Sequence, residues 1–292
     1  SGNYDGSNCG FEEENGDMIF AGSSNVNASG TDGLVLKLDS MGQEIWSNTY
    51  FSSEGTQDDR INDIINTPDG GYLGVGTSHT NTWILKLDTD GNAIWNNTSI
   101  GGGGFSVITT SDNSYVVGGY SSNSDGQLIK FNSFGEVQWS QTYDQPGEIK
   151  DCIETTDFGF ICTGVYSAPG NVKEMYLLKL DSLGQEEWNQ SYGGNDFDEG
   201  INCQLTNEGG YVILGNTRSY GDGSMNGWLV KTDSLGQELW NVVFGNDGTD
   251  EYFESLDLTH DDGFIMSGRI NQLGQAWVVK VDSYGQEEWS QL

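Results

Sequence analysis

One pattern of 13 residues recurs six times along this chain of 292 residues. A clear copy runs from Leu34 to Trp46 and reads Leu-Val-Leu-Lys-Leu-Asp-Ser-Met-Gly-Gln-Glu-Ile-Trp. The tryptophans that close the copies lie 49, 44, 49, 52 and 49 residues apart: Trp46, Trp95, Trp139, Trp188, Trp240 and Trp289. A period of about 40–50 residues is typical of repeats that each form one supersecondary unit and pack on their neighbours. We therefore expect a single repeat domain over 1–292, with repeats of about 1–50, 51–99, 100–143, 144–192, 193–244 and 245–292.

Each repeat contains four short strand-like runs separated by turn residues. In the second repeat these runs are 61–66, 72–78, 83–88 and 93–98, and we name them A, B, C and D. Runs A and B are joined by Thr-Pro-Asp-Gly-Gly, and runs C and D by Thr-Asp-Gly-Asn, both of which favour tight turns. Run C is hydrophobic on both faces, as in a strand that is covered on both sides. The pattern predicts an all-β fold, a six-bladed β-propeller of four-stranded antiparallel blades. A β-solenoid is the alternative, but its repeats are usually shorter.

Two stretches of the repeat resemble known families. The run from Ser191 to Glu199, followed by Glu-Gly-Gly-Tyr-Val-Ile-Leu-Gly at 208–215, resembles the SBBP-type β-propeller repeat of secreted and surface proteins. The Leu-Asp-Ser-x-Gly-x-x-x-Trp stretch resembles the tryptophan-docking motif of PQQ-like quinoprotein propellers, with a turn one residue shorter. The resemblance implies an extracellular module used in binding or surface architecture. The resemblance says little about biochemical activity, because such propellers host many functions.

The charge of the chain limits its partners. The formal net charge is −33, with 44 acidic and 11 basic residues. Such a chain repels nucleic acid and anionic membrane surfaces, and no apolar run reaches the roughly 20 residues of a membrane helix. We expect no nucleic-acid partner and no membrane insertion. The chain begins at a serine, which favours a processed, secreted or cell-surface form.

The four cysteines lack the spacing of a zinc site. Cys152 and Cys162 lie symmetrically about the turn at 156–158, so they are expected to face each other across one hairpin. A disulfide and two buried thiols both stay open as alternatives.

The connections between runs predict where a functional surface lies. In an antiparallel A-B-C-D blade, the D–A and B–C loops emerge at one end and the short A–B and C–D turns at the other. The D–A loops (51–60, 100–104, 143–150, 193–200 and 245–251) and the B–C loops (167–174 and 218–227) vary in length and composition. Variable loops on a rigid scaffold are the usual layout of a binding site. We name this end of the repeats the loop face.

Acidic residues gather in the D–A loops. Asp59, Asp198 and Asp250 are interpreted as equivalent positions, and Asp5 joins them. The candidate metal ligands are Asp5, Asp59, Asp196, Asp198, Glu199, Asp247, Asp250 and Glu251. Clustered carboxylates suit Ca²⁺, which takes six to eight oxygen ligands. The alternative is structural: each Asp accepts backbone N–H bonds at the entry to strand A.

Six lysines recur in run C, as in Lys37 and Lys179, and each has an Asp or Asn two residues later. Residues i and i+2 of a strand share one face. We therefore expect each lysine stem to pack between blades with its ammonium paired to that neighbour.

The candidate binding residues are the arginines and tyrosines of the loop face: Arg60, Tyr120, Tyr166, Arg218, Tyr220 and Arg269. Aromatic and arginine side chains commonly anchor protein or glycan partners. No catalytic residue is predicted, because His79 and His260 fall at opposite ends of the repeats. We also expect no quinone and no nucleotide cofactor.

The leading interpretation is a non-enzymatic extracellular module that binds through the acidic loop face, with Ca²⁺ as its candidate cation. Its partners would be proteins, glycans or copies of itself, in adhesion, surface-layer or filament architecture, or glycan recognition. The alternative is a carbohydrate-active enzyme of the sialidase or lyase kind that uses Arg60, Arg218, Arg269 and nearby acids.

Overall fold

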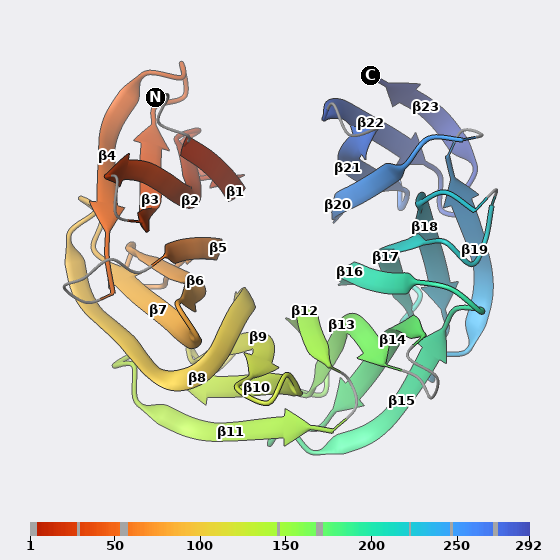
Figure 1. The fold of residues 1–292 in the computed structure, drawn as a ribbon, viewed down its shortest axis with the longest axis horizontal. Helices are drawn as coiled ribbons and strands as arrows, with labels where there is room; N and C mark the ends of the chain where they lie inside the picture. The colour runs from red at the N-terminus through yellow and green to blue at the C-terminus, as the bar shows by residue number, and fades with distance from the viewer. Residues whose placement is uncertain are drawn as a thin grey trace. The chain divides into compact units, whose positions relative to one another are not determined.

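The computed structural model describes residues 5–27, 30–52, 58–144, 147–167, 172–221, 223–245, 248–270 and 274–292. All regular structure in these residues is β, and the 23 strands follow one another without an intervening helix (Figure 1). Accordingly, this part of the chain contains no helix that could span a membrane. The predicted all-β class and the antiparallel four-strand units are confirmed.

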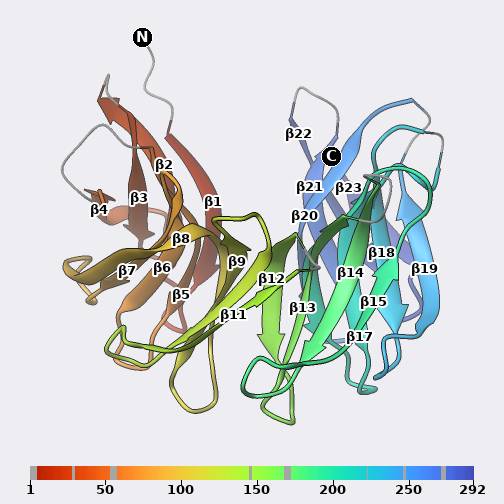
Figure 2. The ribbon, with the colours of Figure 1, turned by 60° about the horizontal axis from the view of Figure 1, so that its bottom comes forward.

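The strands form one seven-stranded and four four-stranded antiparallel sheets, in which neighbours along the chain are neighbours in the sheet (Figure 2). The first sheet comprises β1 (Asp5–Glu12), β2 (Met18–Asn27), β3 (Gly30–Leu38) and β4 (Glu44–Tyr50). The seven-stranded sheet comprises β5 (Asp59–Asn66), β6 (Tyr72–Ser78), β7 (Asn81–Leu87), β8 (Ala93–Thr109), β9 (Tyr115–Ser121), β10 (Gly126–Phe131) and β11 (Val137–Tyr143).

The fourth repeat forms β12 (Glu148–Glu154), β13 (Phe160–Ser167), β14 (Lys173–Leu180) and β15 (Glu186–Tyr192). The fifth forms β16 (Asp198–Leu205), β17 (Tyr211–Thr217), β18 (Asn226–Thr232) and β19 (Glu238–Phe244). The sixth forms β20 (Glu251–Leu258), β21 (Phe264–Ile270), β22 (Gln275–Val281) and β23 (Glu287–Gln291). Each repeat therefore contributes strands A to D in chain order, as the sequence predicts.

Backbone contacts divide the chain into two compact units, residues 1–142 and 143–292. Unit 1 holds the first three repeats and unit 2 the last three. In unit 1 one expectation is wrong: the segment 100–104 is not a loop but part of β8, which pairs with β7 on one side and β9 on the other. This connection is the shortest of the D–A connections, and Gly102 supplies the positive φ (121°) at the change of partner.

Neighbouring repeats within a unit pack through apolar cores. In unit 1, Ile19, Val35 and Trp83 belong to one core between repeats 1 and 2, and Val75, Val117 and Phe131 to one between repeats 2 and 3. In unit 2, equivalent cores join repeat 4 to repeat 5 and repeat 5 to repeat 6. Strand C is buried along almost its whole length in the middle repeats, for example in β18. Its two-sided hydrophobic pattern is thus explained by the sheets that cover it.

The cysteine pair lies in one of these sheets. Cys152 on β12 and Cys162 on β13 stand directly opposite each other, as the symmetry about their turn predicts. Both are buried and free, so the structure agrees with the alternative of two buried thiols.

Within each unit, the closing tryptophan of a repeat packs against the C–D turn of the next repeat, as Trp46, Trp95, Trp188 and Trp240 do. The Gly236 turn lies so close to Trp188 that a Cβ at Gly236 would come within 2.7 Å of the indole ring. The hydroxyl of Tyr192, four residues after Trp188, donates a hydrogen bond of 2.6 Å to the carbonyl oxygen of Gly236. Tyr50 makes the same bond to Gly91 in unit 1, also at 2.6 Å. The recurring tryptophan and glycine therefore connect consecutive repeats.

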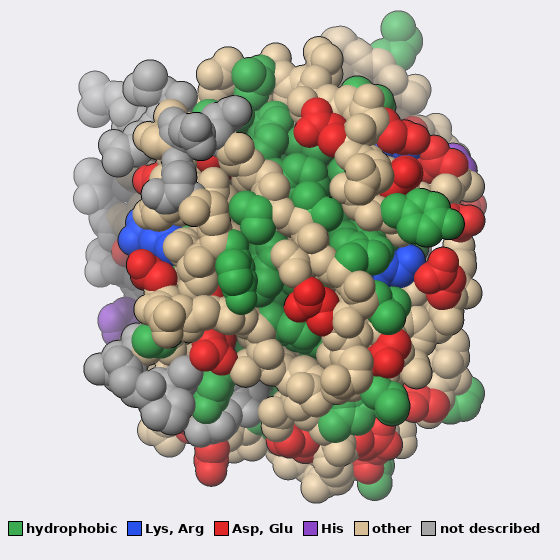
Figure 3. Space-filling view, turned by 90° about the vertical axis from the view of Figure 1, so that its right-hand side faces the viewer, with side chains coloured by type: hydrophobic (Ala, Val, Ile, Leu, Met, Phe, Trp, Pro, Cys, Tyr) green, Lys and Arg blue, Asp and Glu red, His purple; other side chains and the backbone are tan. Residues whose placement is uncertain are grey.

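At the tips of most C–D turns stands an exposed hydrophobic side chain. These residues are Met41, Phe134, Leu183, Leu235 and Tyr284, each more than half exposed. On the side of the molecule that carries β19, hydrophobic side chains lie among scattered acidic ones, and Lys and Arg side chains are few (Figure 3).

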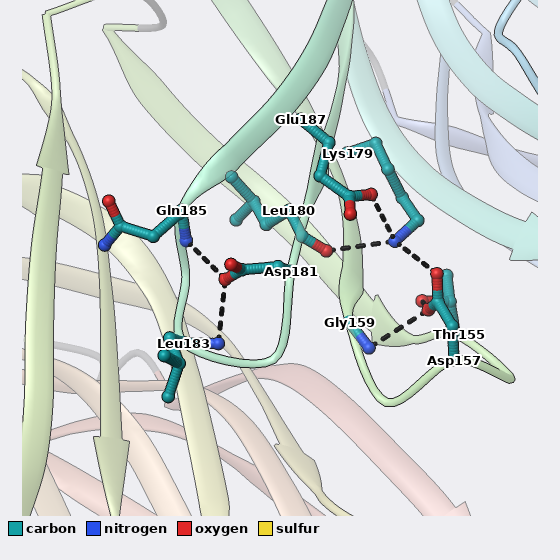
Figure 4. A network of polar contacts seen from close by, with 9 residues as sticks. All are labelled: Thr155, Asp157, Gly159, Lys179, Leu180, Asp181, Leu183, Gln185 and Glu187. Carbon is teal, nitrogen blue, oxygen red and sulfur yellow. Dashed lines mark hydrogen bonds and ion pairs between the residues drawn. The ribbon is translucent and has the colours of Figure 1, made fainter.

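The predicted partners of the repeated lysines are wrong, although local pairing is confirmed. Lys179 bonds Asp157 of the A–B turn (2.9 Å), Glu187 of strand D (3.1 Å) and the carbonyl oxygen of Leu180 (3.0 Å) (Figure 4). Asp181, two residues further on, instead accepts N–H bonds from Leu183 and Gln185 at 2.8 Å and closes the C–D turn. The geometry of the C–D turn thus engages Asp181, a local constraint that strand periodicity does not reveal.

Candidate functional site: the loop face of unit 2

The loop face is best described in unit 2, where loops from the fifth and sixth repeats meet. The D–A loop of repeat 5 connects β15 to β16, and the B–C loop of the same repeat connects β17 to β18. The described part of the D–A loop of repeat 6 leads into β20. Several of the predicted metal ligands make hydrogen bonds that connect these three loops.

Asp198 holds two of the loops together from a fully buried position. Its carboxylate accepts a hydrogen bond from the Gly194 N–H (2.9 Å), another from the Ser219 hydroxyl (2.7 Å) and a third from the Thr217 hydroxyl. Both carboxylate oxygens are therefore occupied by protein donors. The structural alternative for this residue, an acid that organises the entry to strand A, is what the geometry supports.

Asp59 makes the same arrangement in unit 1. It is buried and accepts bonds from the N–H (2.8 Å) and hydroxyl (3.0 Å) of Ser52 in the D–A loop. Across the sheet it faces Ser78, as Asp198 faces Thr217. A hydroxyl residue at the end of strand B, opposite an acid at the start of strand A, is thus a recurring loop anchor. These hydroxyl partners were missed, although their recurrence at Ser24, Ser78 and Thr217 is visible in the sequence.

The strand register corrects one of the predicted equivalences. Asp5 is paired with Ser24, so its equivalence with Asp59 is confirmed for the backbone. In the sixth repeat, however, Glu251 and not Asp250 occupies that register position, opposite Ile270. The predicted equivalence was wrong because it aligned aspartates with aspartates. Counting residues from the bulge in strand A aligns Glu251 with Asp59 instead.

The two acids of the sixth repeat also act within the protein. Asp250 accepts an N–H bond of 2.9 Å from Met225 in the B–C loop of repeat 5. Glu251 is fully buried, accepts the Thr249 hydroxyl at 2.5 Å, and donates its own N–H to the Met225 carbonyl at 2.8 Å. The D–A loop of repeat 6 is thereby tied to the neighbouring repeat.

The remaining candidate ligands are dispersed. Asp196 is exposed and accepts the N–H of Phe197 (2.7 Å), while Glu199 accepts a bond from Asn216 (3.2 Å). Burial raises the pKa of Glu199 above its usual range. Asp247 and the side chain of Asp5 lie outside the described residues. Within the described parts of the chain, no three His, Cys, Asp or Glu side chains are grouped as a metal site requires, and Ca²⁺ binding stays a prediction.

Arg218 and Tyr220 are presented by the B–C loop of repeat 5. The Tyr220 side chain is 41% exposed, yet its hydroxyl donates to the carbonyl oxygen of Gly193 at 2.9 Å. Its ring lies 5.1 Å from that of Trp228. Arg218 is exposed, and its N–H donates to the carbonyl oxygen of Phe197 at 2.8 Å. The loop is thus fixed while both side chains remain accessible.

The other predicted binding residues do not join this pair in the same way. Arg269 lies on β21, where its guanidinium contacts Glu254 (3.0 Å) and the ring of Tyr252 (4.8 Å to the centroid). Tyr166, at the end of β13, is half-buried opposite Glu174. Two residues belong to unit 1: Arg60, exposed on β5, and Tyr120, whose ring packs 5.4 Å from that of Phe105.

Comparison with known proteins gives the class of fold. No family model matches the chain, and no curated protein matches it. Among solved structures, the Dos1 propeller is similar with a TM-score of 0.62 at 12% identity, covering 96% of this chain and 68% of that one. A protein of unknown function from Bacteroides caccae has a TM-score of 0.58 at 14% identity, covering 93% and 92%. Drosophila Plexin A, solved in complex with Semaphorin 1b, has 0.57 at 8%, covering 94% and 76%. These similarities show a β-propeller type of fold and nothing finer.

Proposed function

We propose that the six repeats are the six blades of one β-propeller that works outside the cell as a non-enzymatic binding module. Its binding surface is the loop face, and its partner is a protein with a basic surface, as in adhesion or surface-layer assembly. The SBBP-like and PQQ-like repeat resemblance and the acidic composition support this proposal.

The observation that carries the proposal is the fixed loop of Arg218 and Tyr220. Asp198, Ser219 and Asn226 hold this loop through hydrogen bonds, with Asn226 donating to the carbonyl oxygens of Tyr220 (3.3 Å) and Ser224 (3.0 Å). A loop that is ordered before binding loses less conformational entropy when a partner docks. Tyr and Arg side chains are also the residues most enriched among binding hot spots.

Charge supports a basic partner. The exposed acids Asp196 and Glu254 both belong to unit 2, the first on the D–A loop of repeat 5 and the second on β20, beside Arg269. In a chain of net charge −33, such acids attract a cationic surface and repel an anionic one. The association should therefore weaken as salt is added.

The test is an array of basic, neutral and acidic peptides together with a glycan array. We expect wild-type protein to bind basic peptides at low salt, and the double variant Arg218→Ala/Tyr220→Ala to bind them at least tenfold more weakly. Leu183→Ala, at an exposed C–D turn of the opposite end, is the matched control and should bind like wild type. Equal binding by all three proteins, or none to any peptide, would refute the proposal.

The enzymatic alternative has one local observation in its favour, the contact of Arg269 with Tyr252 and Glu254 on neighbouring strands. An arginine beside a tyrosine and a glutamate suits attack on a carboxylated sugar. Release of product from sialosides or uronate polysaccharides by wild type, and its loss in Tyr252→Phe, would favour the enzyme over the binding module.

A further inference from the structure

Lys231, the lysine of the fifth repeat, has one acidic partner where Lys179 of the fourth repeat has two, and its surroundings differ from those of other repeats in two positions. Lys179 of repeat 4 has a second acid, Glu187, on strand D. At the register position of Glu187, repeat 5 has Leu239. Lys231 keeps only Glu208 at 2.9 Å and a long bond of 3.4 Å to the carbonyl oxygen of Ser283. Its side chain is nonetheless only 6% exposed.

The second difference lies at the first residue of strand B in the following repeat. This position is Tyr72, Tyr115 and Tyr211 in repeats 2, 3 and 5, and phenylalanine in repeats 4 and 6. In unit 1 the Tyr72 hydroxyl accepts a bond from Lys37 (3.0 Å) and donates to Glu13 (2.9 Å), so it completes the lysine–acid pair. Phe264 stands at this place beside Lys231, fully buried and without a hydroxyl.

A cavity of about 270 Å³ lies beside Lys231 and Phe264, where the tyrosine hydroxyl is missing. It opens between the turns of repeats 5 and 6, at the end of unit 2 opposite the loop face. Its polar lining includes Lys231, Glu208 and Asp262, and its apolar lining includes Leu258, Phe264 and Tyr284. Its volume falls just below the roughly 300–1,000 Å³ of pockets for drug-sized ligands, so a single ring fits it better than a larger molecule.

We propose that this cavity binds one neutral sugar ring, whose hydroxyl takes the place that the tyrosine hydroxyl occupies beside Lys37. Lys231 can donate to a sugar oxygen, while Glu208 and Asp262 can accept from sugar hydroxyls. Glu208 and Asp262 would repel the carboxylate of an acidic ligand, and Lys231 would repel a cation. A neutral ligand is therefore favoured. Tyr284, which is 75% exposed, and Leu258 offer an apolar surface to the C–H face of a ring. The site is distinct from the loop face and does not rest on the function proposed for it.

The experiment is ligand-observed NMR on the full chain, with glucose, galactose, mannose, fucose, N-acetylglucosamine and glucuronate as probes. We expect at least one neutral sugar to bind with a dissociation constant on the order of 1–10 mM. Phe264→Tyr restores the side chain found in three other repeats and should weaken that binding at least tenfold by filling the cavity. The absence of binding by every neutral sugar, or tighter binding of glucuronate, would overturn the proposal.

Two controls keep the outcome interpretable. Tyr211→Phe makes the equivalent change beside Lys179, where Glu187 still pairs with the lysine, and should leave sugar binding unchanged. Arg218→Ala/Tyr220→Ala should also leave it unchanged, so failure of the loop-face proposal is separable from failure of this one. Sugar binding that survives Phe264→Tyr at wild-type strength, with the variant folded by circular dichroism, places the sugar elsewhere and refutes the site.

Discussion

Single residues explain how consecutive repeats hold together. The Tyr192 hydroxyl is buried and is the partner of the Gly236 carbonyl at the next C–D turn. In the fifth repeat the same position is Phe244, which packs edge-on against Phe253 and cannot donate to Gly285. The chain therefore contains its own comparison between an interface with this hydrogen bond and one without it.

We predict opposite effects for the two exchanges at this position. Tyr192→Phe leaves the Gly236 carbonyl without its donor and should lower the free energy of unfolding by about 1–2 kcal/mol. Phe244→Tyr adds the missing donor opposite Gly285 and should raise it by about 0.5–1.5 kcal/mol. Urea unfolding of both variants measures the difference, and a destabilised Phe244→Tyr would show that the sixth turn does not lie where the repeat pattern puts it.

At the scale of elements, strand A makes side-chain hydrogen bonds to the next repeat that the repeat motif does not predict. A bulge at Asn62 in β5 turns the Asp63 carboxylate toward β8, where it accepts the Val107 N–H at 2.8 Å. It also accepts the N–H of Ile64 at 2.8 Å. In unit 2, Asp151 of β12 bonds the Cys203 N–H of β16 at 2.9 Å in the same way. Polar side chains after the bulge therefore join the first strands of adjacent repeats.

This link should make stability depend on pH. Burial raises the pKa of Asp63 from 3.8 to about 6, because the charged form is poorly solvated. The protonated carboxyl is favoured in the folded state, so its contribution to stability is present below pH 4 and is lost as pH rises through about 6. In Asp63→Asn this loss is absent. The free energy of unfolding of the variant relative to wild type should therefore rise by up to about 3 kcal/mol between pH 4 and pH 7.

Urea titrations at several pH values measure this difference, with Asp90→Asn in an exposed turn as the control. The difference measured for the control gives the effect of removing an exposed carboxyl, and the difference for Asp63→Asn should exceed it. A flat difference for Asp63→Asn would mean that its two N–H bonds compensate for its burial.

The sequence predicted elements better than it predicted contacts. Strand positions and turns follow from the alternation of hydrophobic runs with Asp-x-x-Gly turns, which are local properties. The partners of Lys179 could not be predicted in this way, because Asp181 is far nearer in sequence than Asp157, yet its carboxylate is used by the N–H groups of its own turn. For the loop face, the acids at the start of strand A were predicted, but their structural role follows from burial and from hydrogen bonds to Thr217 and Ser219, which lie about 20 residues further along the chain.

At the scale of the whole molecule, the lysine pairs leave most of the acidity unbalanced. Of the 11 basic residues, six are the strand-C lysines that pair with turn acids, and 44 acidic residues are distributed over the chain. Self-repulsion of this charge opposes folding and is screened by salt. The two compact units share one charge sign, so screening is expected to act on both.

The last prediction separates this general screening from specific calcium binding. Raising NaCl from about 0.01 to 0.15 M shortens the Debye length from about 30 to 8 Å, so the melting temperature should rise by several degrees. If the loop acids also bind Ca²⁺, millimolar CaCl₂ should raise it further than NaCl of equal ionic strength, and a chelator should reverse that excess. A calcium concentration of 100 times the dissociation constant would add about 2.7 kcal/mol. MgCl₂ is the matched control, since Mg²⁺ requires stricter octahedral geometry. Equal melting temperatures in all three salts would exclude calcium binding, and the role of Asp59 and Asp198 would then be to anchor the loops.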